Sequence, residues 1–440
     1  MPASPLDSAL YRDLLGDAEM GRLFTDTAEV RAMLLVEGAL AKAQGDLGLI
    51  PAASAAFLHR AMLEVQIDPA GLAAETGANA VPVPALVAAA RKALEAPDHT
   101  QYLHWGATSQ DVIDTGLMLR LRQAIRLMEA RLDGLLQGLA TLAEAHADLP
   151  MAARTYAQVA TPTSFGAVVA SWGNPLLRQR QRLENVRRDL LMVSLSGAAG
   201  TNSAIGPKAP EVRAALAQAL NLGDPGQSWH STRDSVATFA NWITITAQAI
   251  GKLGEDLILL SQSGIEEVSL GAGGASSTMP QKANPVGPSV LVALARQMIG
   301  LNAVMTGAAL HRQQRDATAW LCEWLTLPQM CLGLGRMLLT AGTLAETLAP
   351  NPDRMLAPLQ DGLGLLYAEA VTFALAEILP RPEAQAAVKA LTKEARDTGT
   401  PLPALAARAF PALDWASRLA PAAQLGQAPA EARAFAAACR

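Results

Sequence analysis

Residues 103–111, with the sequence LHWGATSQD, place two hydroxyls directly before a long stretch that predicts a helix. The side chains of Thr108 and Ser109 and the backbone N–H groups at a helix N-terminus suit a carboxylate, and the helix dipole adds to the attraction. Ordinary N-capping by Thr108, Ser109 or Asp111 explains the same residues. The segment therefore predicts either a carboxylate-binding helix start or a capped helix.

Residues 270–285, with the sequence LGAGGASSTMPQKANP, combine glycines with small polar residues. The glycines favour a flexible loop, Ser276 and Ser277 follow them, and Lys282 and Asn284 stand two residues apart before the next predicted helix. The order of Gly, Lys and Ser/Thr that defines a P-loop is absent. A plain linker is the alternative, but it does not account for the pattern Met-Pro-x-Lys-x-Asn.

A third polar segment, residues 154–163 (RTYAQVATPT), contains Tyr156 and Gln158. Its proline, Pro162, and its small residues favour a loop that leads into another long helix. Taken alone, this segment predicts a connection and no particular chemistry.

The composition favours helices that can bury a large interior. Of the 440 residues, 50% are hydrophobic and only 4% aromatic, and Ala and Leu dominate. Ala and Leu favour helices, whereas strands prefer β-branched and aromatic residues. The net charge of −5 argues against nucleic acid as the main partner, because phosphate binding needs a concentrated basic face. A small anionic substrate remains compatible, because a few local cations in a cleft can outweigh a weakly acidic surface.

Several features indicate a cytoplasmic protein. Cys322, Cys331 and Cys439 are odd in number and widely spaced, so they predict neither a disulfide framework nor a metal site. The N-terminal residues contain early acids and no apolar core, unlike a signal peptide. Residues 290–310 are apolar but interrupted by polar side chains, which predicts a buried amphipathic helix and no membrane span.

Proline and glycine spacing divides the chain into three predicted domains. These are an N-terminal helical domain (residues 1–105), a central long-helix bundle (106–349) and a C-terminal helical domain (350–440). Within the central domain we expect long helices over residues 112–149, 163–195, 231–264, 289–327 and 329–348, with the second kinked near Pro175. No segment predicts a sheet strand. Helices this long need partner subunits to cover them, so the fold class is all-α and oligomeric.

The apolar side chains of the first long helix recur at steps of three and four residues. They are Leu117, Leu121, Ile125, Met128, Leu132, Leu135, Leu139 and Leu142. This spacing predicts one buried face along a helix of roughly 55 Å, at ~1.5 Å per residue.

The run from Ser276 to Asn284 (SSTMPQKAN) resembles the signature loop of the fumarase/aspartase superfamily. The other two segments occur in the order in which that superfamily keeps its remaining active-site regions. Residues 104–116 (HWGATSQDVIDTG) resemble the branch of adenylosuccinate lyases and carboxymuconate cycloisomerases. Residues 77–82 (GANAVP), residues 229–234 (WHSTRD) and the group Trp320, Glu323 and Trp324 favour the cycloisomerase side of that branch.

The resemblance implies a homotetramer with active sites assembled from several subunits, and neither a metal nor an organic cofactor. It also implies a small tricarboxylate substrate. The implied reaction is the reversible lactonisation of 3-carboxy-cis,cis-muconate, in the breakdown of protocatechuate through β-ketoadipate. A carbon–nitrogen lyase resembling adenylosuccinate lyase and a catalytically silent, crystallin-like oligomer are the alternatives.

The resemblance also implies roles for individual residues. Ser276 matches the position of the family's acid–base group, with Ser277 as the alternative and Met279 fixing the spacing. Lys282 and Asn284, with Thr108 or Ser109, are expected to stabilise the anionic intermediate. The expected substrate-binding residues are His104, Thr108, Ser109, Tyr156, Gln158, Arg233, Ser277 and Met279.

Two further arginines, Arg154 and Arg315, are weaker candidates for binding a carboxylate and favour structural ion pairs. Three positions depart from the family pattern. Ala275 and Ala283 replace a usual glycine and a frequent arginine, and Tyr156 stands where the lyases have histidine.

Overall fold

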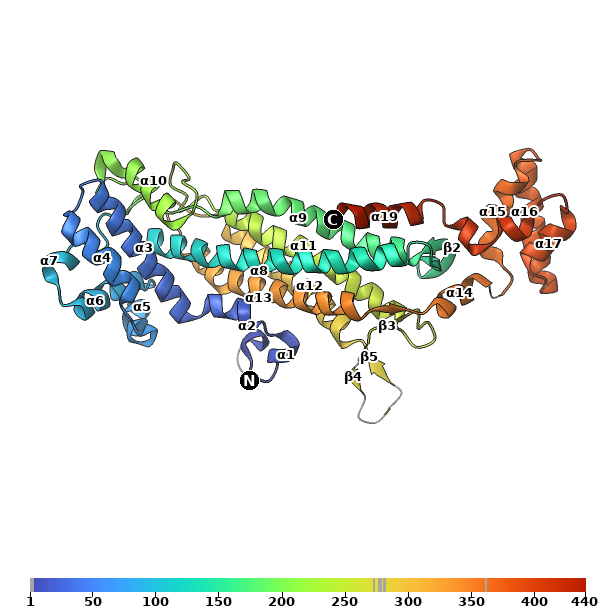
Figure 1. Cartoon of the computed structure of the whole chain (residues 1–440), viewed down its shortest axis with the longest axis horizontal. Coiled ribbons are helices and arrows are strands. Elements are labelled where there is room, and N and C mark those ends of the chain that lie inside the picture. The colour runs from blue at the N-terminus through green and yellow to red at the C-terminus, as the bar shows by residue number, and fades with distance from the viewer. Residues whose placement is uncertain (1–3, 272–273, 276–278, 280–281, 361) are drawn as a thin grey trace. The chain divides into compact units, whose positions relative to one another are not determined.

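The chain folds predominantly into helices, as its Ala- and Leu-rich composition predicts. The computed structural model describes residues 4–271, 274–275, 279, 282–360 and 362–440 (Figure 1). Contacts divide the chain into two compact units, each assembled from three separate stretches of sequence.

The first unit comprises Met1–Arg131, Gln179–Gln248 and Ala293–Leu338. Its short helices are α1 (Arg12–Leu15), α2 (Ala18–Gly21), α3 (Asp26–Asp46), α4 (Ala52–Glu64), α5 (Ala73–Asn79), α6 (Val83–Leu94), α7 (Pro97–Thr100) and α10 (Ala209–Leu220). Helices α3, α4 and α6 pack around an apolar cluster that includes Met33, Leu58 and Leu86.

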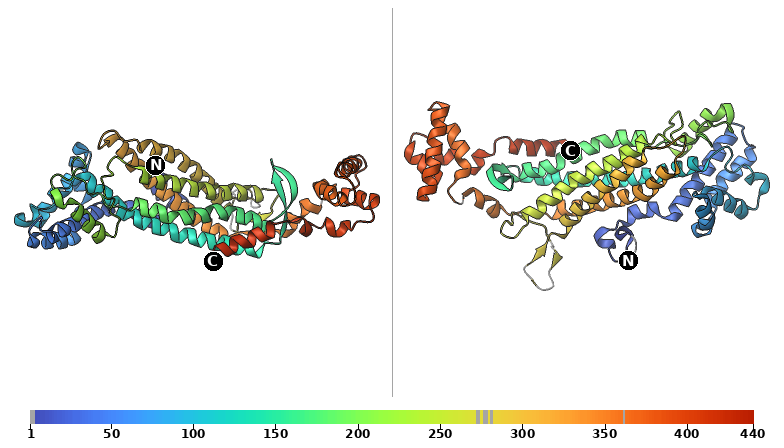
Figure 2. Two further views of the ribbon diagram at one scale, coloured as in Figure 1. Left: turned by 90° about the horizontal axis from the view of Figure 1, so that it is seen from above. Right: turned by 180° about the vertical axis from the view of Figure 1, so that it is seen from behind.

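The second unit comprises Leu132–Arg178, Ala249–Val292 and Leu339–Arg440. Its helices are α14 (Pro352–Gln360), α15 (Ala368–Leu375), α16 (Arg381–Thr398), α17 (Leu402–Ala409), α18 (Trp415–Arg418) and α19 (Ala428–Ala438). Helices α15, α16 and α17 gather around a core that includes Val371, Ala395 and Leu402. Figure 2 shows these orange-red helices close together.

Long helices contribute turns to both units. They are α8 (Ser109–Ala145), α9 (Phe165–Leu190), α11 (Asp234–Leu260), α12 (Val286–Ala308) and α13 (Ala317–Thr347). The predicted apolar face of α8 is buried from Leu117 to Leu139, and only Leu142 at its end is half-buried. The steps of three and four residues therefore identified the correct face of this helix.

Two helix boundaries differ from the prediction in a way that changes the number of helices or their continuity. The stretch expected as one helix over 289–327 is broken between Ala308 and Ala317, where the carboxylate of Asp316 accepts from the backbone N–H groups of Thr318 and Ala319 and so caps α13. Conversely, α13 continues through Pro328, which the prediction took as a boundary. Burial on both sides of this proline outweighs the one helical hydrogen bond that it removes.

The prediction that no segment forms a strand is wrong for three short antiparallel pairs. Strand β1 (Pro150–Thr155) pairs with β2 (Gln158–Ser164), β3 (Val268–Ser269) with β6 (Ala349–Pro350), and β4 (Gly274–Ala275) with β5 (Ala283–Asn284). Tyr156 and Ala157 turn the first hairpin, both with positive φ. Such two-residue turns usually contain Asn or Gly, so their absence hid this hairpin in the sequence.

Helix α12 is less buried than the sequence led us to expect. Only 33% of its most apolar 18-residue stretch is buried within the protein, and Ile299 and Val304 are exposed. Among the described residues it is the one helix long and apolar enough to cross a membrane. Core helices of soluble proteins share these properties, so length and composition alone do not indicate a membrane span.

The close approach of α9 to the end of α8 gives a test of the packing in the second unit. A Cβ on Gly166 would lie 2.7 Å from the Cα of Ala147, whereas a Cβ on Gly134 would meet nothing within 4 Å. We expect Gly166→Ala to lower the free energy of unfolding by about 1–3 kcal/mol, because backbone atoms must move. Gly134→Ala is the matched control and should raise it by about 0.5–1 kcal/mol through helix propensity. Denaturant unfolding followed by circular dichroism measures both, and equal effects would contradict the described packing.

Candidate functional site

The start of α8 borders a pocket of about 250 Å³ in the first unit. Thr108, Ser109 and Arg315 line it, together with the indoles of Trp320 and Trp324. In the part of the chain that the structure describes, the hydroxyls of Thr108 and Ser109 make no hydrogen bond, so N-capping does not occupy them. Two hydroxyls, one cation and a helix N-terminus on one pocket are suited to binding a carboxylate.

Asp111 holds the backbone around this pocket in place. Its buried carboxylate accepts from the backbone N–H groups of Thr108 at 3.0 Å, Ser196 at 2.8 Å and Gly197 at 3.0 Å. The ring of His230 also donates from Nε2 to Asp111 at 2.8 Å, since a carboxylate can only accept. Asp111 is therefore a structural anchor and not a group that faces substrate.

Arg233 lies at the centre of a buried charge cluster. Its guanidinium donates to Asp114 at 2.7 Å and to Glu323 at 2.8 Å, and its side chain is 0% exposed. The two carboxylates outweigh burial, which alone would lower the pKa of Arg233, and raise that pKa so that the guanidinium stays charged. The predicted contact between Arg233 and a substrate carboxylate is therefore corrected to a structural ion pair, because no exposed N–H edge remains.

Two tryptophans complete the surroundings of this buried cluster. Trp229 places its ring 4.6 Å from the guanidinium carbon of Arg233, and Trp320 donates its indole N–H to Asp114 at 3.1 Å. Trp320 also lines the pocket, so the cluster sits directly behind the pocket wall. The sequence analysis did not identify Asp114. The sequence feature that could have identified Asp114 is a second acidic residue on the same helical face as Asp111, inside an otherwise apolar stretch.

His104 lies outside the residues that line this pocket. It has a φ of 65° and shares a hydrogen bond of 2.6 Å with the buried Glu37. Burial acts to lower the pKa of His104, but the hydrogen bond and charge of Glu37 outweigh it and raise that pKa. His104 thus fixes the turn that leads into α8, and its predicted contact with substrate stays a prediction.

Tyr156 and Gln158 are exposed on the β1–β2 hairpin of the second unit. Arg154, on the same hairpin, donates through both Nη atoms to the buried carboxylate of Glu267 at 2.8 Å. The expected structural ion pair of Arg154 is therefore present, and the hairpin presents Tyr156 and Gln158 to the surface.

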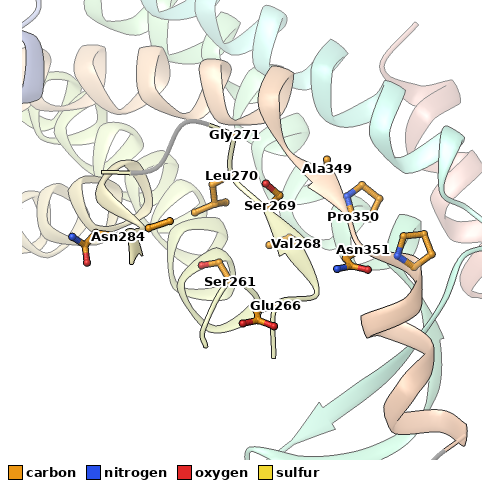
Figure 3. Close-up of a pocket in the computed structure, with 12 residues that line it drawn as sticks. Ser261, Glu266, Val268, Ser269, Leu270, Gly271, Asn284, Ala349, Pro350 and Asn351 are labelled. Carbon is orange, nitrogen blue, oxygen red and sulfur yellow. The ribbon is translucent and has the colours of Figure 1, made fainter. Parts of the chain in front are cut away.

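Asn284 borders a second pocket, of about 470 Å³, within the second unit. Strands β3 and β6 form one side of it through residues such as Ser269 and Pro350 (Figure 3). Lys282 and Met279 are exposed, and the Lys282 N–H donates to the Met279 carbonyl at 3.0 Å. Ser276 and Ser277, the predicted acid–base groups, lie outside the described residues.

The described candidate residues thus form two groups, one in each unit. Thr108 and Ser109 share a pocket with Arg315, whereas Lys282 and Asn284 lie near each other on the β4–β5 segment. Within the described ranges, no group of three or more His, Cys, Asp or Glu side chains is arranged to hold a metal ion.

Comparisons with known proteins cover both groups. Residues 18–300 match a family model described as lyase. A 3-carboxy-cis,cis-muconate cycloisomerase from Pseudomonas aeruginosa is 40% identical over 403 residues, 90% of this chain and 86% of that protein. A protein of the same name from Bradyrhizobium diazoefficiens is 39% identical over 88% of this chain and 87% of that protein. The solved 3-carboxy-cis,cis-muconate lactonizing enzyme of Pseudomonas putida has a TM-score of 0.92 at 34% identity, over 98% of this chain and 99% of that one.

The buried cluster gives a stability prediction. Arg233→Leu leaves Asp114 and Glu323 without their cation, so we expect the free energy of unfolding to fall by about 3–5 kcal/mol. Lys42→Met, which breaks the exposed pair of Lys42 and Asp46, is the control and should cost less than about 1 kcal/mol. Chemical denaturation of the three proteins measures both losses. Similar small losses for the two variants would contradict the anchoring role of the buried cluster.

Proposed function

The chain belongs to the lyase family of the fumarase/aspartase superfamily, and from this membership we propose that it interconverts 3-carboxy-cis,cis-muconate and a carboxymuconolactone. The observation that carries the proposal is the similarity to cycloisomerases along nearly the whole chain. The pocket at the start of α8 adds support, because its hydroxyls and cation suit a substrate with several carboxylates.

The proposed reaction is a proton transfer coupled to the making or breaking of one C–O bond. In lactone opening, a base removes a proton from the carbon beside a carboxylate. The electron pair of that C–H bond becomes the new C=C bond, and the lactone oxygen departs as a carboxylate. The intermediate carries an additional negative charge, and stabilising such charge with prearranged donors is usually the largest catalytic contribution.

We assign the proton transfer to Ser276, with Ser277 as the alternative. A serine hydroxyl is a weak base unless its alkoxide is stabilised. Lys282, which follows closely in the sequence, is the proposed cation that stabilises the alkoxide. In lactone formation the same hydroxyl returns the proton to carbon. Lys282 and Asn284, together with Thr108 or Ser109, are the proposed donors to the intermediate.

Arg315 takes the place of Arg233 as the proposed cation for a substrate carboxylate. It is exposed on the pocket that Thr108 and Ser109 line, whereas Arg233 is buried against two carboxylates. A planar guanidinium matches a carboxylate with two parallel hydrogen bonds, which fixes orientation as well as charge.

His104, Tyr156, Gln158 and Met279 remain proposed substrate-binding residues. Tyr156 at the position of the lyases' histidine is consistent with lactone chemistry. A departing carboxylate has a conjugate-acid pKa of about 4, so it leaves as an anion without a proton donor. A departing amine gains far more from such a donor, which disfavours the carbon–nitrogen lyase alternative.

The proposed assembly is a cytoplasmic homotetramer with three domains per subunit, active sites shared between subunits, and no metal or organic cofactor. The apolar, largely exposed face of α12 supports it, because soluble proteins rarely leave so long an apolar helix uncovered.

The function is tested by following the ultraviolet absorbance of 3-carboxy-cis,cis-muconate with purified protein. We expect steady loss of the conjugated diene with the wild type and no turnover of adenylosuccinate. Ser276→Ala should lower kcat by roughly 10²–10⁴, the usual contribution of a positioned acid–base group. Ser277→Ala is the matched control at the neighbouring position and should lower kcat much less. The reverse ranking would move the acid–base role to Ser277, and an inactive wild type would refute the proposed reaction.

The assembly is tested by sedimentation velocity. We expect the wild type to sediment as four copies of the 46.0 kDa chain. Ile299→Asp places a charge on the exposed face of α12 and should shift the protein toward smaller species, because burying an unpaired charge is costly. Leu63→Asp, at an exposed position on α4, is the control. A folded wild-type monomer would refute the shared-site assembly.

A further inference from the structure

A buried amide lies directly behind the cation of the first-unit pocket. Gln110, the second residue of α8, is only 1% exposed. Its side-chain oxygen accepts from Nε of Arg315 at 2.8 Å. Gln110 therefore connects the pocket with the interior of the unit.

The orientation of this amide is fixed by its other partners. Nε2 of Gln110 donates to Asp114 at 3.1 Å and to the backbone carbonyl of His230 at 3.0 Å. A carboxylate beside a charged guanidinium and a carbonyl both only accept, so the NH₂ group must face them. The amide oxygen consequently points to Arg315 and cannot exchange places with the nitrogen.

This arrangement restrains Arg315 at one edge of its guanidinium. Nε is held by Gln110, and Nη2 donates to the Ala198 carbonyl at 3.3 Å. Across the described part of the chain, the other N–H groups of Arg315, on Nη1 and Nη2, have no protein partner. A free arginine side chain carries about 2 kcal/mol of rotamer entropy, so holding it in advance lowers the cost of binding.

Asp114 extends the restraint to the buried cluster. The Oδ2 atom that accepts from Gln110 also accepts from Arg233 at 2.7 Å. Gln110 is thus oriented by a side chain that is itself fixed by a buried ion pair. The chain of contacts runs from Arg233 through Asp114 and Gln110 to Arg315 at the pocket.

We infer that Gln110 is a positioning residue, which sets the direction of the Arg315 guanidinium for a carboxylate of the substrate. Gln110 also lines the pocket, but its amide nitrogen and oxygen are both bonded to protein partners, so in this role it acts through Arg315. The inference rests on the proposed function for the identity of the ligand. The geometry that orients the amide is independent of that function.

The test compares Gln110→Met, Arg315→Met and the double variant in steady-state kinetics with 3-carboxy-cis,cis-muconate. Methionine keeps the length of the side chain but cannot accept from Arg315. We expect Gln110→Met to raise KM by roughly 10–100-fold, the effect of losing a hydrogen bond to a charged group, while kcat changes much less. If Gln110 acts through Arg315, adding Gln110→Met to Arg315→Met should raise KM little further.

The buried Gln179 in the same unit provides the control. Gln179→Met should leave KM unchanged, which separates positioning from a general loss of stability. Full additivity of Gln110→Met and Arg315→Met, or an unchanged KM in Gln110→Met, would overturn the inference.

A binding measurement separates this inference from the proposed reaction. The probe is propane-1,2,3-tricarboxylate, titrated calorimetrically into the wild type and Gln110→Met. If the wild type shows no turnover but binds the probe at least tenfold more tightly than Gln110→Met, the reaction is refuted and the positioning role stands. Equal affinities, or no binding to either protein, would overturn the positioning role.

Discussion

The ion pair between Arg233 and the carboxylates of Asp114 and Glu323 is the constraint on which the first unit depends. It joins Asp114 on α8 and Glu323 on α13 to Arg233, which directly precedes α11, and the three residues are far apart in sequence. Buried charges tolerate little displacement, because separating them exposes each to a low-dielectric interior. The cluster therefore fixes where these helices meet, and through Gln110 and Trp320 it fixes one wall of the pocket. The same few contacts therefore stabilise the unit and set the geometry of the pocket wall.

The sequence predicted features that follow from local periodicity. Leu117 to Leu139 marked the buried face of α8, because an apolar residue every three or four positions defines one side of a helix. The family was also predictable, because the motif from Ser276 to Asn284 and the residues before α8 are distinctive. The roles of these motif residues are chemical proposals, since neither periodicity nor family membership measures an angle or a distance.

Features set by long-range contacts escaped the sequence analysis. Arg233 was predicted to bind a ligand. Its structural role was missed because the partners that neutralise it, Asp114 and Glu323, lie 119 and 90 positions away in the sequence. The β1–β2 hairpin was missed because Tyr156 and Ala157 adopt positive φ without the glycine or asparagine that usually announces such a turn. The contacts of Arg233 are tertiary, and the turn at Tyr156 and Ala157 lacks the usual turn residues, so no local pattern encoded either feature.

The segmented composition of the first unit has a consequence for how the protein is made. Its last stretch begins at Ala293, so most of the unit emerges from the ribosome well before its final helix. Until Glu323 is synthesised, the buried ion-pair cluster of Asp114 and Arg233 lacks its third member. Completion of this cluster during translation must therefore wait for about three quarters of the chain, and chain termination before α13 would leave the charges of Arg233 and Asp114 without Glu323.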